Sequence, residues 1–180
     1  MDRIKVHDKH FRPFIKHDTI QEKIKNLAQK INIEYNNNPE LPLFVSVLNG
    51  SFMFTSDLIK HINFPCELTF IKISSYSGTS STGEIKQVLG LGIPVKGRQV
   101  IVIEDIVDTG NTIVALHKML KEEGASDIKI CTLLFKPEAY DKSLAVDFAA
   151  IEIPNDFVVG YGLDYNELGR QYKDIYTLDI

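Results

Sequence analysis

The stretch 100–121, VIVIEDIVDTGNTIVALHKMLK, holds the pattern from which the fold can be worked out. It opens with four consecutive β-branched residues, 100–103, which is typical of a strand buried on both faces of a parallel sheet. Two acids and a polar turn follow, and apolar residues then recur at helical spacing toward Gly124, a common helix-ending residue. The stretch therefore predicts a strand, an acidic tip, a loop of small residues and a helix.

Outside this stretch, further strand and helix patterns alternate. Four more strands are predicted from apolar or alternating runs, at residues 43–48, 68–73, 128–135 and 149–153. Apolar residues recurring on one face predict a helix over about 19–36. Such alternation is typical of an α/β fold with a central parallel sheet flanked by helices. The chain fits a single domain, 1–180, and its last residues, YTLDI, are expected to form a closing edge strand.

The acidic tip and the loop after it predict a ligand site. In an open α/β sheet, ligands bind beyond the carboxyl ends of the strands. The loop 108–112 opens a helix, so its backbone N–H groups can hold a phosphate. Glu104 and Asp105 lie close by. Carboxylates repel phosphate, so their presence indicates that they bind something else, either ribose hydroxyls or Mg²⁺. We therefore expect a sugar phosphate with a metal, on a loop that has no Walker A sequence.

Residues 100–112 resemble the phosphoribosyl pyrophosphate (PRPP) binding motif of the type I phosphoribosyltransferases. Four other stretches, in this order and spacing, resemble the hypoxanthine-guanine phosphoribosyltransferases of that family. They are VLNG at 47–50, SY at 75–76 with STGEIK at 81–86, Lys136 after an apolar strand, and IP through FVVGYGLDYNE to Arg170 at 153–170. The match covers most of the chain, from about 43 to 170.

The resemblance implies a set of residues that hold PRPP and Mg²⁺. The 5′-phosphate would lie on Thr109, Gly110, Asn111 and Thr112, and the ribose hydroxyls on Glu104 and Asp105. Pyrophosphate would contact Asn49, Gly50 and Arg170, with a cis peptide before Asn49 as is typical of the family. Mg²⁺ would be held by Glu104, Asp105 and Asp164. Asn49 stands where many members carry a basic residue, which leaves pyrophosphate to backbone amides, and Asn111 replaces a Lys found in some relatives.

The resemblance also implies a purine site under a small hood built from the N- and C-terminal segments. Asp108 would act as the general base at N7 of the purine, and Ser75 and Tyr76 would form a flexible lid. The base itself would contact Lys136, Phe157, Val158 and Asp164. The implied reaction is PRPP plus hypoxanthine or guanine giving IMP or GMP and pyrophosphate.

Two alternatives use the same fold. The first is a regulator that senses PRPP and binds RNA or DNA, and the second is a phosphoribosyltransferase for adenine, orotate or uracil. A regulator should show a basic face, whereas this chain has a net charge of −4 and no Lys/Arg cluster. Lys136 and the stretch 157–164 favour 6-oxopurines over other bases. Without the resemblance, Lys136 would be a solvated strand end and Phe157 an ordinary core residue.

Composition narrows the partners and the compartment. No nucleic-acid partner is expected, and no membrane partner, because no apolar run approaches a membrane span and the N-terminus carries no secretory signal. Cys66 and Cys131 lack paired spacing, so both are expected to be buried and reduced, in a cytoplasmic protein. The expected assembly is a homodimer or homotetramer.

Overall fold

A computed structural model describes residues 2–36, 38–75 and 85–179, with the backbone alone described at residues 74, 75 and 85–88. Its centre is a six-stranded sheet in the order β5-β4-β3-β6-β7-β8. The strands are β3 (Leu43–Leu48), β4 (Glu67–Ser75), β5 (Ile85–Leu89), β6 (Gln99–Val107), β7 (Asp127–Phe135) and β8 (Phe148–Glu152). Five of them run parallel to their neighbours, and β5 is antiparallel to β4. The predicted parallel sheet is therefore confirmed, with one antiparallel strand added at its edge.

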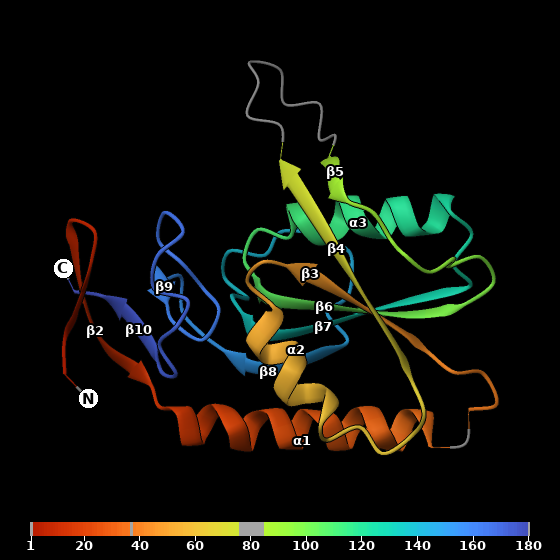
Figure 1. Ribbon diagram of the computed structural model, residues 1–180, viewed down its shortest axis with the longest axis horizontal. Coiled ribbons are helices and arrows are strands. Elements are labelled where there is room, and N and C mark those ends of the chain that lie inside the picture. The colour runs from red at the N-terminus through yellow and green to blue at the C-terminus, as the bar shows by residue number, and fades with distance from the viewer. Residues whose placement is uncertain (1, 37, 76–84, 180) are drawn as a thin grey trace.

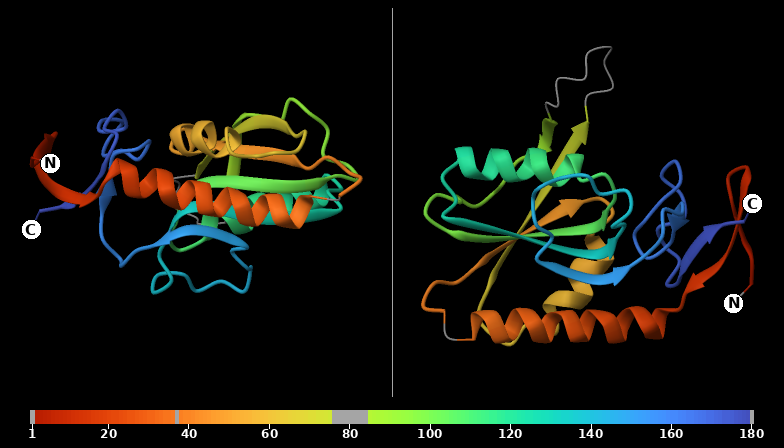
Figure 2. Two further views of the ribbon diagram at one scale, coloured as in Figure 1. Left: turned by 90° about the horizontal axis from the view of Figure 1, so that it is seen from below. Right: turned by 180° about the vertical axis from the view of Figure 1, so that it is seen from behind.

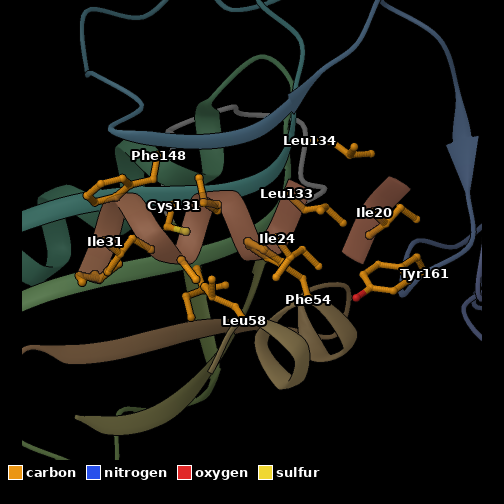
Figure 3. Close-up of a cluster of buried hydrophobic side chains, with 14 of the residues drawn as sticks. Ile20, Ile24, Ile31, Phe54, Leu58, Cys131, Leu133, Leu134, Phe148 and Tyr161 are labelled. Atoms are coloured by element: carbon orange, nitrogen blue, oxygen red, sulfur yellow. The ribbon is translucent and has the colours of Figure 1, made fainter. Parts of the chain in front are cut away.

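Helices cover both faces of this sheet (Figures 1 and 2). Helices α1 (His17–Tyr35) and α2 (Phe52–Ile59) lie on one face, and α3 (Asn111–Glu122) lies on the other. The side chains of α1 and α2 pack with Ile103, Leu133 and other sheet residues into the core cluster drawn in Figure 3. Within the described residues, no helix combines the length and apolarity needed to cross a bilayer. The two-face burial explains why the central strands are almost wholly apolar.

A second, four-stranded antiparallel sheet forms the expected hood (Figure 1). It is built from β1 (Ile4–Val6), β2 (Lys9–Ile15), β9 (Val158–Val159) and β10 (Ile175–Leu178), in the order β1-β2-β10-β9. Both ends of the described chain thus lie in one small sheet beside the larger one. The expected closing edge strand is wrong in one respect, because β10 pairs with β2 on one side and β9 on the other and so is internal.

Several element boundaries differ from the sequence prediction, and those of α1 and β6 bear most on the site. Helix α1 starts at His17, with Lys16 as an N-cap that makes no side-chain capping bond, and ends at Tyr35. The acids Glu104 and Asp105 lie inside β6, because its pairing with β7 continues as far as Val107. The predicted acidic tip is therefore the last part of the strand itself.

Candidate active site

The loop between β6 and α3 forms an open cradle. A pocket is lined by the ten consecutive residues 104–113. Gly110 is the N-cap of α3 at φ +81°, and no side-chain capping bond satisfies the first turn. A Cβ on Gly110 would lie 2.3 Å from Cε2 of Tyr140, so a larger residue would push this loop away from its support. Because the first turn of a helix leaves N–H groups unpaired, the cradle suits an anion.

The four residues expected at the 5′-phosphate all belong to this cradle. Thr109, Asn111 and Thr112 are exposed, while Gly110 is buried beneath the loop. Two exposed hydroxyls and an amide side chain thus surround the start of the helix. Sequence reasoning missed Tyr140 and Lys142, whose side chains pack against Gly110 from the segment after β7.

One buried and one partly buried carboxyl group belong to the cradle. Glu104 is buried, and its Oε2 has no hydrogen-bond partner within the described residues. Burial raises the pKa of Glu104 well above its usual value, and the charge of Asp105 raises it further. Burial also raises the pKa of Asp105 to about 6, although the Ile106 amide and the Arg170 guanidinium oppose the shift. A cation or hydroxyl donors at this position would offset the cost of ionising both groups.

The turn after β3 approaches Asp105 closely. The peptide Leu48–Asn49 is cis, as the resemblance implied. A Cβ on Gly50 would lie 1.5 Å from Oδ2 of Asp105, so only glycine lets this backbone pass the carboxylate. Helix α2 begins immediately afterwards at Phe52. The turn expected to bind pyrophosphate, Asn49–Gly50, thus lies against Asp105, which is expected to bind the ribose.

Asp164 and Arg170 reach the same region from the hood. Arg170 Nη2 lies 2.8 Å from Asp164 Oδ1, and Arg170 Nη1 donates to the carbonyl of Gly162 at 2.8 Å. The charge of Arg170 lowers the pKa of the Asp105 carboxyl, and the charge of Asp164 raises it. Within the described residues, however, no three His, Cys, Asp or Glu side chains gather as a metal-binding group.

Lys136 and Asp108 meet beside the cradle. The Lys136 side chain is 8% exposed, and its Nζ lies 2.7 Å from Oδ2 of Asp108, which is 43% exposed. The Lys136 backbone amide donates to the carbonyl of Val107, so the residue sits beside the end of β6. A donor and an acceptor thus stand side by side at Asp108, one of the residues that line the pocket.

Phe157 and Val158 lie in the hood. Phe157 is 45% exposed, with its ring near those of Phe11 and Tyr165 at centroid distances of 6.1 and 5.7 Å. Val158 is buried in β9, opposite Thr177 of β10. Part of the Phe157 ring therefore remains free to stack on a ligand. Of the two expected lid residues, Ser75 ends β4 without a described side chain, and Tyr76 lies outside the described residues.

Comparison with known proteins agrees with this geometry. A model of the phosphoribosyl transferase domain matches residues 16–166. The hypoxanthine-guanine phosphoribosyltransferase of Bacillus subtilis is 42% identical over 165 residues, which cover 91% of each chain. A bifunctional protein TilS/HprT of Listeria innocua is 40% identical over 166 residues, but the match covers 92% of this chain and 25% of that protein. This chain thus spans about a quarter of the bifunctional relative.

A solved structure supports the same assignment. A hypoxanthine-guanine phosphoribosyltransferase from Bacillus anthracis, with HEPES in its active site, superposes with a TM-score of 0.86 at 36% identity, covering 93% of this chain and 98% of that one. Sequence identity and fold therefore lead to one conclusion: the chain belongs to the phosphoribosyl transferase domain family, among its hypoxanthine-guanine phosphoribosyltransferases.

Proposed function

We propose that this chain transfers the 5-phosphoribosyl group of PRPP to N9 of hypoxanthine or guanine, giving IMP or GMP and pyrophosphate. The observation that carries the proposal is the contact of 2.7 Å between Lys136 and Asp108, the latter a residue of the cradle. A 6-oxopurine presents two neighbouring groups on one edge, O6 and N7. Lys136 donates to O6, and Asp108 accepts a proton from N7.

The proton transfer explains how the site activates the base. When Asp108 takes the N7 proton, electron density returns to the ring and N9 becomes a better nucleophile. N9 then forms a bond to C1′ of the ribose while the bond from C1′ to the pyrophosphate oxygen breaks. The partly exposed ring of Phe157 stacks on the purine, and backbone carbonyls around Val158 and Asp164 accept from the 2-amine of guanine.

PRPP is proposed to lie along the sheet edge. Its 5′-phosphate accepts from the first turn of α3 and the hydroxyls of Thr109 and Thr112. Its ribose hydroxyls donate to the carboxylates of Glu104 and Asp105. This would give a partner to Oε2 of Glu104, which has none among the described residues. The pyrophosphate accepts from the amides of the Asn49–Gly50 turn and from Arg170.

The residues fit a divalent cation as well. Mg²⁺ commonly takes one or two carboxylates and completes its shell with water and substrate phosphates. Burial raises the pKa of both Glu104 and Asp105, so a cation beside them would favour their ionised forms. The proposed protein ligands are Glu104, Asp105 and Asp164, which do not yet gather as one metal-binding group among the described residues, so substrate phosphates and water would supply the rest of the shell. Bound Mg²⁺ would neutralise charge on the pyrophosphate. Activity that survives complete chelation would contradict this requirement.

The central test is a panel of bases assayed with PRPP and Mg²⁺. We expect nucleotide formation from hypoxanthine and guanine and little from adenine, orotate, uracil or xanthine. Turnover of adenine at the rate of hypoxanthine would refute the 6-oxopurine assignment. If no base is turned over and the protein binds RNA tightly, the proposed enzyme function is wrong and the regulator is the better assignment. Sedimentation at assay concentration tests the predicted homodimer or homotetramer, and fractionation of cells tests the predicted cytoplasmic location.

A further inference from the structure

Three consecutive residues of the hood adopt positive backbone φ angles. They are Gly160 at +99°, Tyr161 at +51° and Gly162 at +98°. This region is unfavourable for a residue with a Cβ, and such residues persist only where the surroundings hold them. A tyrosine between two glycines therefore points to contacts that define its position.

The two glycines are explained by close backbone approaches on opposite sides. A Cβ on Gly160 would lie 2.1 Å from the carbonyl oxygen of Asp174, just before β10 of the hood. A Cβ on Gly162 would lie 2.1 Å from the carbonyl oxygen of Gly50, in the turn after β3. The tripeptide 160–162 thus joins the hood to the larger sheet.

The side chain of Tyr161 crosses this junction and is 2% exposed. Figure 3 shows its ring among the core residues that include Ile20 and Phe54, with the hydroxyl directed toward α2. The hydroxyl donates to Oδ2 of Asp57 on α2. Gln21 of α1 donates from Nε2 to the same oxygen at 2.8 Å and to the Tyr161 hydroxyl at 3.1 Å. Three elements that are distant in sequence therefore meet in one hydrogen-bonded group.

The charge states of this group are well defined. Burial raises the pKa of the Tyr161 hydroxyl, and its bond to Asp57 raises it further, so the hydroxyl keeps its proton and remains a donor. Partial burial would raise the pKa of Asp57, but bonds from Lys60, Tyr161 and Gln21 outweigh it and lower the pKa. Asp57 is therefore an ionised acceptor, which makes this a charge-assisted hydrogen bond.

We infer that Tyr161 is a positioning residue that sets the pyrophosphate turn and the purine-binding segment at a defined separation. Asp57 belongs to α2, the helix that follows Asn49 and Gly50, while Tyr161 lies between the purine contacts Val158 and Asp164. The hydroxyl bond and the Gly162–Gly50 approach tie the two subsites together at adjacent residues. The inference rests on the proposed function, because it concerns the alignment of N9 with the departing pyrophosphate.

The substrates make this role separable from folding. PRPP occupies the phosphate cradle and the pyrophosphate turn, and the product IMP occupies the cradle and the purine segment. The reacting complex alone occupies the purine and pyrophosphate subsites together. Loss of the Tyr161–Asp57 bond should therefore slow the reaction. The affinities of the protein for PRPP and for IMP, each measured alone, should stay the same.

The test variant is Tyr161→Phe, which keeps the ring and removes the hydroxyl. Because a small misplacement of reacting groups can cost about 100-fold, we expect kcat with hypoxanthine to fall roughly 10- to 100-fold. Kd for PRPP and for IMP, each measured alone, should change less than about 3-fold, a span of about 0.65 kcal/mol. The matched control is Tyr35→Phe, a buried tyrosine of the same core at the other end of α1, and its kcat should equal that of the wild type.

A double-mutant cycle assigns the effect to the bond. If Tyr161 acts through Asp57, then Asp57→Ala, which removes the acceptor, lowers kcat in the wild type but adds little to Tyr161→Phe. Should Tyr161→Phe not fold, Asp57→Ala breaks the same bond from the α2 side and carries the same prediction. A kcat within 2-fold of wild type, or an equal loss of PRPP and IMP affinity, overturns the positioning role. A wild type that turns over no base overturns the proposed function, and this role falls with it.

Discussion

Replacing Lys136 by Met removes the ammonium group proposed to read the 6-position and keeps an unbranched stem. The Lys136 side chain is only 8% exposed, and its Nζ is held 2.7 Å from Asp108. A hydrogen bond that involves a charged group contributes about 1.5–3 kcal/mol, which corresponds to roughly 10- to 150-fold in kcat/KM. Adenine presents an amine to the same ammonium, so wild-type protein should reject it by about 10⁴-fold or more.

Lys136→Met should therefore lower kcat/KM for hypoxanthine by roughly 10- to 150-fold and leave the value for adenine almost unchanged. The ratio between the two bases narrows by the same factor. Asp108 loses its partner, but at 43% exposure water can solvate it, so the free energy of unfolding should fall by no more than about 1 kcal/mol.

The assay compares kcat/KM for hypoxanthine, guanine and adenine in both proteins. Lys129→Met is the matched control, because Lys129 lies on the same strand β7 but pairs with Glu34 on α1. It should leave the base ratio at the wild-type value. An unchanged ratio in Lys136→Met, or equal losses for hypoxanthine and adenine, would show that Lys136 does not read the 6-position.

Three further predictions address the neighbouring groups. Asp108→Asn should lower the rate of the chemical step by on the order of 10²–10⁴-fold with little change in PRPP affinity, and an unchanged single-turnover rate would reject Asp108 as the base. Gly110→Ala should weaken binding of ribose 5-phosphate and cost about 1–3 kcal/mol of unfolding free energy, because its Cβ would meet Tyr140. Both stabilities are measured by urea titration. The control is Gly97→Ala, at φ +74° with open space around it, whose loss of unfolding free energy reports the cost of the positive φ angle alone. In the folded protein without metal, the pKa of Asp105 is about 6, whereas in the unfolded chain this carboxyl loses its proton near pH 4. Between these values the folded state holds the extra proton, so the free energy of unfolding declines as pH rises from about 4 to 6. Asp105→Asn should therefore gain up to about 3 kcal/mol over wild type above pH 6 and almost nothing below pH 4, and a gain that is independent of pH would exclude this origin.

Local patterns predicted several elements closely. The run 43–48 is β3 to the residue, and 128–135 differs from β7 by one residue at its start, because a strand buried on both faces is mostly apolar along its length. The start of α1 was predicted two residues late, because the apolar periodicity from which it was predicted does not mark the first turn, which begins at His17. Helix ends depend on one or two bonds, whereas a buried strand depends on every residue in it.

The candidate site divides in the same way. The cradle, residues 104–113, is contiguous in sequence, so it could be located before the fold was known. The pair formed by Lys136 and Asp108 joins residues 28 positions apart, and no local pattern specifies that contact. The group of Gln21, Asp57 and Tyr161 spans as many as 140 positions, and sequence reasoning missed it.

By itself, the sequence determined the parallel sheet, the succession of strand, acids, small-residue loop and helix in the stretch 100–121 and, through its motifs, the family of this chain. Those features arise from periodicity and from contiguous residues, which a linear pattern can carry. The tertiary structure alone decided that burial raises the pKa of Glu104 and Asp105, that β10 is internal to the hood, and that Tyr161 ties the hood to α2. Burial and long-range hydrogen bonds depend on which distant segments come together, and only packing of the whole chain determines that.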